Sequence, residues 1–157
     1  MRSHNMKLVE PDENYYEQLA VDILARTLMG EAAGISVLCG SDMYRAIASV
    51  VMNRLAVSAE RGKYWWGNDI ITICQKPYQF TCWNRSSPFY KRMQEYDEHN
   101  DRFYLCKKIA TECVQGVFRG TANGATHYHY IHSSPDWAKF ETPCFTVNEV
   151  LFYRLVG

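Results

Sequence analysis

The sequence predicts an α+β fold that is mainly α, in which a helical body is followed by a small antiparallel β-sheet. Two observations support this prediction. Before the last third of the chain, apolar residues recur at spacings of three and four, which is typical of amphipathic helices. In the last third the pattern changes to the alternation of strands, over residues 126–132 and 150–156.

The first predicted helix contains the stretch that we expect to carry the chemistry, LARTLMGEAAG at residues 24–34. Glu31 continues the apolar face of this helix. Apolar neighbours and the negative end of the helix dipole near Gly34 both favour the protonated form of its carboxyl group. A carboxyl group that keeps its proton can act as a general acid on a glycosidic bond. Glu31 is therefore the candidate catalytic residue, and the alternative is a solvated side chain in a fraying last turn. The apolar face consists of Tyr16, Leu19, Ala20, Ile23, Leu24, Thr27 and Leu28.

A second helix is predicted from about residue 43 to residue 61. A polar break precedes it, and Ser41 or Asp42 is placed there to cap its first turn. The helix carries Asn53 in mid-course. This amide is either exposed or turned toward a cleft, where it would hold Glu31 or a ligand.

Residues 76–84 are predicted to form a ligand-facing loop, because a proline ends regular structure and amides then alternate with aromatic residues. Amides such as Gln79 bind hydroxyl and N-acetyl groups, and aromatic faces pack on sugar rings. The alternative is a loop that is anchored by buried Phe80 and Trp83. The helical pattern returns from residue 86 to 116, with Asp101 as a candidate cap.

Composition limits the function further. The 157 residues suffice for one domain, and we expect residues 1–5 to be vector-derived and 6–157 to form a single catalytic domain. Lys+Arg and Asp+Glu both number 17, which disfavours nucleic acid as a partner. With 11 Tyr and 4 Trp, the chain suits a groove for flat ligands such as sugars, although aromatic cores have the same composition. No apolar run is long enough for membrane insertion.

The cysteines are expected to be free, buried thiols. Their spacing is irregular and includes no Cys-x-x-Cys pair, so it does not predict a zinc ribbon. Cys74 and Cys82 flank a turn and are the one pair that we consider for a disulfide. The six residues are Cys39, Cys74, Cys82, Cys106, Cys113 and Cys144.

Taken together, the order of these motifs resembles the catalytic domain of the spore-cortex-lytic enzyme family, the SleB-like cell-wall hydrolases. The likeness extends from about Val21 to Arg154. One position departs from the family pattern, because the family commonly has a histidine where Val150 stands. The matching segments are LAR at 24–26, GEA at 30–32, AIASVVMNR at 46–54, YQFTCW at 78–83, GATHYH at 124–129, WA at 137–138 and FYR at 152–154.

The resemblance implies a lysozyme-like fold and cleavage of peptidoglycan glycan strands between N-acetylmuramic acid and N-acetylglucosamine. It assigns the acid to Glu31 and implies a lytic transglycosylase that forms 1,6-anhydro products. That reaction needs one carboxylate, whereas simple hydrolysis usually needs a second one, for which Asp42, Asp69, Asp136 and Glu141 are candidates. The substrate-binding residues that we expect are Asn53, Gln79, Phe80, Trp83, Thr126 and Tyr128, with the Tyr128 hydroxyl orienting Glu31.

We expect no cofactor, a monomer, and action on the wall in the periplasm or outside the cell. Because no signal peptide is apparent, release at lysis of a phage-infected cell is one route to the wall. The competing interpretations are a muramidase-type hydrolase, a zinc-dependent amidase or peptidase with His127, His129 and His132 as ligands, and a wall-binding module without activity.

Overall fold

The computed structural model describes residues 13–33, 40–62 and 65–156. The predicted class, α+β and mainly α, is confirmed, while the expected vector-derived residues 1–5 lie outside the described ranges. The α-helices are α1 (Glu13–Ala33), α2 (Ser41–Arg61), α3 (Ile70–Gln75), α4 (Tyr90–Gln94) and α5 (Asp101–Val114). Short 3-10 helices are η2 (Thr81–Trp83), η3 (Ala122–Gly124) and η4 (Asp136–Ala138), and the strands are β1 (His127–Tyr130), β2 (Phe145–Val147) and β3 (Val150–Tyr153).

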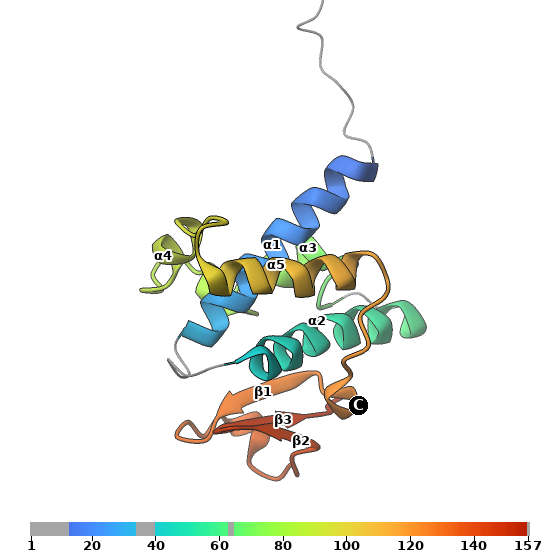
Figure 1. Cartoon of the computed structure of the whole chain (residues 1–157). Coiled ribbons are helices and arrows are strands. Elements are labelled where there is room, and N and C mark those ends of the chain that lie inside the picture. Colours follow the sequence, from blue (N-terminus) through green and yellow to red (C-terminus); the bar gives the residue numbers. More distant parts are fainter. Residues whose placement is uncertain (1–12, 34–39, 63–64, 157) are drawn as a thin grey trace, which may run out of the picture.

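The helices and the sheet form layers with α2 in the middle. Figure 1 shows α1 and α5 crossing on one side of α2 and the sheet on its other side, and α2 packs against both α5 and the sheet. Val150 and Phe152 of β3 are fully buried and join the same apolar cluster as the helices. A single core therefore connects the helical body to the sheet.

The sheet is antiparallel and has the strand order β1-β3-β2. Phe152 of the central strand is paired with Tyr128 of β1 and with Phe145 of β2. The predicted strands at 126–132 and 150–156 contain β1 and β3, although both are shorter than predicted. Strand β2 was not predicted, because its three residues are too few to establish an alternating pattern.

The helix caps differ from those predicted. Helix α2 begins at Ser41 after Gly40, which makes no side-chain capping bond, so Ser41 and Asp42 lie inside the first turn. At α5 the Asn100 side chain accepts a hydrogen bond from the Phe103 N–H, and Asn100 rather than Asp101 is the cap. Acidic residues one position inside a helix start are favoured by the helix dipole, which explains why they resemble caps in the sequence.

The predicted buried face of α1 is correct from Ala20 to Leu28, but Tyr16 is exposed. Among the described cysteines, Cys74, Cys82, Cys106 and Cys113 are buried and all are free, whereas Cys39 lies outside the described residues. The prediction of buried free thiols is thus confirmed for these four, and Cys144, which is also free, is half-buried.

Gly30 allows α1 to lie unusually close to η2. A Cβ atom at this position would lie 2.7 Å from the Cys82 Cβ and 2.8 Å from the Met93 Sδ, well inside van der Waals contact. A glycine inside a helix costs about 1 kcal/mol relative to alanine. At this position the packing has no space for the methyl group of an alanine.

We therefore predict that Gly30→Ala destabilises the protein by about 1–2 kcal/mol, because overpacking outweighs the gain in helix propensity. The measurement is the free energy of unfolding from urea denaturation. Gly40→Ser is the control, since a Cβ at Gly40 meets no atom within 4 Å. A Gly30→Ala variant as stable as the unmodified chain would contradict this packing.

Candidate active site

Glu31 lies in the last turn of α1, where it is half-buried and lines a cavity of about 410 Å³. Segments far apart in sequence surround this cavity, namely the end of α1, the interior of α2, the loops before and after α3, the start of η2, β1 and η4. A carboxylate is thus placed at the wall of a hollow large enough for part of a ligand. The lining residues are Glu31, Arg54, Trp66, Tyr78, Gln79, Phe80, Thr81, His127, Tyr128 and Trp137.

Both oxygens of the Glu31 carboxylate accept hydrogen bonds. The Tyr128 hydroxyl donates to Oε1, and the Cys82 backbone N–H donates to Oε2 at 3.3 Å. Burial, followed by the charge of Glu31, raises the pKa of Tyr128 well above its usual range, so this hydroxyl keeps its proton. The two donors fix the orientation of the carboxylate and stabilise its negative charge.

Arg54 is a functional candidate that the sequence analysis missed. It is 7% exposed, and its Nε donates to the Thr126 carbonyl at 2.7 Å. Its guanidinium carbon lies 5.5 Å from the centre of the Trp66 ring and 5.1 Å from that of Phe80. Burial lowers the pKa of Arg54 to about 10, against the opposing effects of Tyr128 and Glu31. The cavity thus contains a buried cation that interacts with Glu31.

One nitrogen of this guanidinium is of particular interest. Arg54 Nη1 is buried and has no hydrogen-bond partner among the described residues. An unpaired donor on a buried cation is energetically costly. Such a group in a cavity wall is available to a polar atom of a ligand or to a rearranged carboxylate. Arg54 could have been identified from the sequence, because it follows Asn53 in the segment at 46–54 that matches the family pattern.

Asn53 and Thr126 support the cavity from behind and do not line it. The Asn53 amide donates to the carbonyls of Thr121 and Ala125, both at 2.8 Å, and so ties α2 to the chain before β1. Thr126 is fully buried, and its hydroxyl accepts a hydrogen bond from the Leu155 N–H at 2.9 Å. Both side chains position β1, which carries Tyr128.

In the predicted ligand-facing loop, residues 76–84, some side chains line the cavity and others do not. Gln79 and Phe80 line the cavity, and the Gln79 amide also donates to the carbonyls of Trp66 and Ile73, which holds the loop in place. Trp83 is not among the lining residues, because its indole N–H turns back to donate to the Thr27 hydroxyl at 2.9 Å.

Aromatic side chains that were not predicted complete the cavity. Trp66 and Trp137 both contact His127, with ring centroids 5.9 Å and 5.3 Å from the imidazole. Tyr78 is 86% exposed and has a φ of 66°, in the left-handed region that is unfavourable for a residue with a side chain. Strain of this kind is concentrated at functional sites. An exposed ring on a strained backbone in the wall of this cavity makes Tyr78 a candidate ligand contact.

The three histidines considered as zinc ligands are engaged by different partners. His127 packs against Trp66 and Trp137, His129 shares a hydrogen bond of 2.9 Å with the Tyr153 hydroxyl, and His132 lies 3.9 Å from Glu149. Within residues 13–33, 40–62 and 65–156, no group of three or more His, Cys, Asp or Glu side chains is arranged to hold a metal ion.

None of the four acidic residues considered as a second catalytic carboxylate lines the Glu31 cavity. Asp69 caps α3 by accepting from the Thr72 N–H, and Asp42 lines a separate cavity beside α2. Asp136 lines a neighbouring cavity, and Glu141 is exposed. Among the described lining residues, Glu31 is the one carboxylate.

The environment of His127 predicts a pH dependence of stability. Burial, with a further effect of Arg54, lowers the pKa of His127 from 6.5 to about 4. Between these pH values the unfolded chain binds more protons than the folded one, so the free energy of unfolding falls as the pH falls. His127→Gln should therefore lose less stability than the unmodified chain between pH 7 and pH 4.5. Urea midpoints at both pH values measure this difference, and equal losses in the two proteins would contradict it.

Comparison with known proteins identifies the family. A family model described as cell wall hydrolase matches residues 41–153, a segment that includes Arg54, Tyr78 and Tyr128 and begins after Glu31. Searches of curated proteins and of solved structures gave no match. Among the described residues, no helix has the length and apolar character needed to cross a membrane. Since the matched segment covers well over half of the chain, the protein belongs to the cell wall hydrolase family, whose substrate is peptidoglycan.

Proposed function

We propose that this enzyme cleaves the glycan strands of peptidoglycan between N-acetylmuramic acid and N-acetylglucosamine as a lytic transglycosylase. The observation that carries the proposal is that Glu31 is the one carboxylate among the described residues of a cavity with several aromatic side chains. Transglycosylation needs one carboxylate that works twice, whereas hydrolysis usually uses two carboxylates on opposite sides of the bond.

In the first half of the reaction Glu31 donates its proton to the glycosidic oxygen. The bond between this oxygen and C1 of the muramic residue breaks, and the leaving sugar takes the proton as a hydroxyl group. In the second half the Glu31 carboxylate removes the proton from the muramic 6-hydroxyl, and that oxygen bonds to C1. The product is a 1,6-anhydro sugar, no water is consumed, and Glu31 regains its proton.

The groups around Glu31 suit these two steps. After the first proton transfer the carboxylate is negative, and the Tyr128 hydroxyl and the Cys82 N–H donate to it. The buried guanidinium of Arg54 adds a positive charge in a poorly solvated place, where such a charge acts strongly. Because these donors and charges are already oriented, little reorganisation is needed during the reaction.

The aromatic side chains of the cavity suit the binding of sugar rings. Trp66, Tyr78 and Trp137 all line it, and Tyr78 exposes most of its ring. Flat aromatic faces pack on the C–H faces of sugars, while amides such as Gln79 bind hydroxyl and N-acetyl groups. The substrate lies outside the cytoplasmic membrane, so the enzyme acts in the periplasm or outside the cell.

The test of the acid is Glu31→Gln, which keeps the size of the side chain and removes its proton donor. We predict a loss of activity on purified peptidoglycan of roughly 10²- to 10⁴-fold, with binding retained. Glu98→Gln is the matched control, since the Glu98 side chain is 77% exposed on the surface. Mass spectrometry of the products from the unmodified enzyme should show sugars lighter by one water than reducing sugars. Reducing sugars would instead indicate a muramidase-type hydrolase, and cleaved peptide bonds would overturn the proposal.

Tyr78 provides a second test, because strain and binding can be separated there. Tyr78→Ala and Tyr78→Gly both remove the ring, so each should raise KM by about threefold to tenfold. Only the glycine also relieves the left-handed backbone, so Tyr78→Gly should be more stable than Tyr78→Ala by about 1 kcal/mol. Tyr78→Phe, which keeps the ring, serves as the control. An unchanged KM in both ring-less variants would exclude Tyr78 from binding.

A further inference from the structure

A second cavity lies beside the Glu31 cavity, and Trp137 stands between them. It has a volume of about 480 Å³ and is lined by His129 and Tyr153 of the sheet and by Ser133, Ser134, Asp136 and Lys139 of the segment after β1. Trp137 lines the Glu31 cavity, whereas its chain neighbour Asp136 lines the second one. The rings of His127 and His129, one from each cavity, both contact Trp137, at centroid distances of 5.3 Å and 5.5 Å.

The two cavities differ in chemistry. The Glu31 cavity holds aromatic rings, which suit sugars, beside a carboxylate and a guanidinium that interact with each other. The second cavity combines serine hydroxyls with one carboxylate, Asp136, and one ammonium group, Lys139, both on exposed side chains. Neither of these charged residues forms an ion pair with another described residue. Two unpaired charges of opposite sign in one hollow are complementary to a ligand that carries both a carboxylate and an amine.

Peptidoglycan supplies such a group at the required place. The muramic sugar carries a short peptide on its lactyl ether, and that peptide contains free carboxylates and, at its diamino acid, an amine. If the muramic sugar occupies the Glu31 cavity, as the proposed function requires, its peptide begins within that cavity and must leave toward a neighbouring surface. The Trp137 side chain is 38% exposed, so the peptide can pass over the edge of its ring toward the second cavity.

We infer that the second cavity binds the peptide attached to the muramic sugar. Lys139 pairs with a carboxylate of this peptide, and Asp136 pairs with its amine. This inference rests on the proposed function for the position of the sugar. The cavity thereby selects peptide-bearing strands over bare glycan, since bare glycan offers no such pair of charges.

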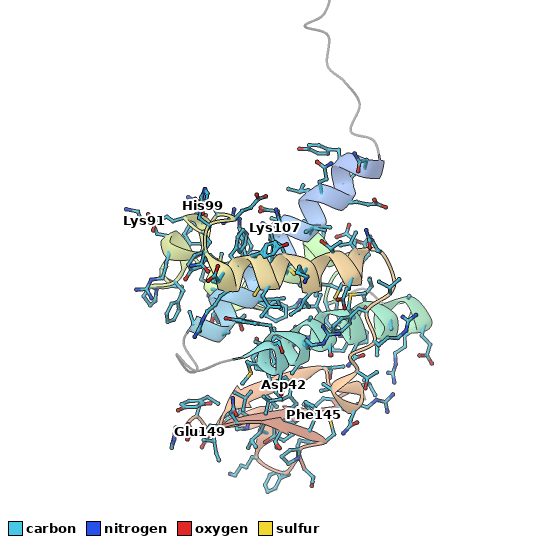
Figure 2. All side chains as sticks on the ribbon, viewed as in Figure 1. Asp42, Lys91, His99, Lys107, Phe145 and Glu149 are labelled. Atoms are coloured by element: carbon cyan, nitrogen blue, oxygen red, sulfur yellow. The ribbon has the colours of Figure 1, made fainter. Side chains whose placement is uncertain are left out.

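Binding of the peptide alone tests the inference without any cleavage. Isothermal titration with L-alanyl-γ-D-glutamyl-L-lysine as the probe should give millimolar or tighter binding to the unmodified protein and to Glu31→Gln. Lys139→Gln and Asp136→Asn should each weaken it by about threefold to tenfold, as expected for partly exposed ion pairs. Lys91→Gln on α4, at the opposite end of the molecule from the sheet, is the control and should bind normally (Figure 2). Absent binding, or equal binding by the double variant of Lys139 and Asp136, would overturn the inference.

Kinetics separate this inference from the proposed function. On peptide-bearing strands the double variant should lose about tenfold or more in kcat/KM, while on strands stripped of peptide it should equal the unmodified enzyme. Equal losses on both substrates, or no loss on either, would contradict a peptide site. Failure of the proposed function is recognised differently, by peptide-bond cleavage in the unmodified enzyme or by full activity of Glu31→Gln.

Discussion

The close approach of α1 to η2 is the constraint on which the site depends. Gly30 has no side chain, so the helix backbone comes near enough to Cys82 for the next residue, Glu31, to accept a hydrogen bond from the Cys82 N–H. On the other side β1 brings the Tyr128 hydroxyl to the second carboxylate oxygen. A carboxylate held by donors from two separate segments cannot turn without losing one of them. The packing at Gly30 therefore sets the direction of the proposed acid.

The burial of the Arg54 guanidinium is energetically unfavourable, and it occurs in the wall of the same cavity. A cation that is 7% exposed loses most of its hydration, and the hydrogen bond that its Nε donates to the Thr126 carbonyl does not replace it. The rings of Trp66 and Phe80 compensate in part through their π faces. The proximity of Glu31 also favours the charged form of Arg54. The guanidinium is thus kept charged at the cavity wall by one acidic neighbour and two aromatic rings.

The sequence predicts those features that repeat along the chain or occur in local motifs. Helical spacing located α1 and α2, alternation located β1 and β3, and the matching segments indicated Glu31, Gln79, Phe80 and Tyr128, which all line one cavity. What could not be predicted depends on the direction of single side chains. Asn53 and Arg54 are neighbours on α2, but successive residues of a helix point in different directions. The Asn53 amide therefore reaches backbone carbonyls, whereas the Arg54 guanidinium reaches the cavity. Likewise, no spacing rule indicates that Trp83 turns to Thr27, or that Tyr78 adopts a positive φ.

Trp137 connects the sheet to both cavities. His127 and His129 point to the same side of β1, two residues apart, and the indole packs against both rings. The strand spacing separates these two residues by roughly 7 Å along β1. His127 lines the Glu31 cavity and His129 lines the second one. In the binding mode that we propose, the sugar lies in the cavity of Glu31 and its peptide lies in the cavity of Asp136 and Lys139, so one aromatic residue beside β1 separates the part of the substrate that reacts from the part that is recognised by charge.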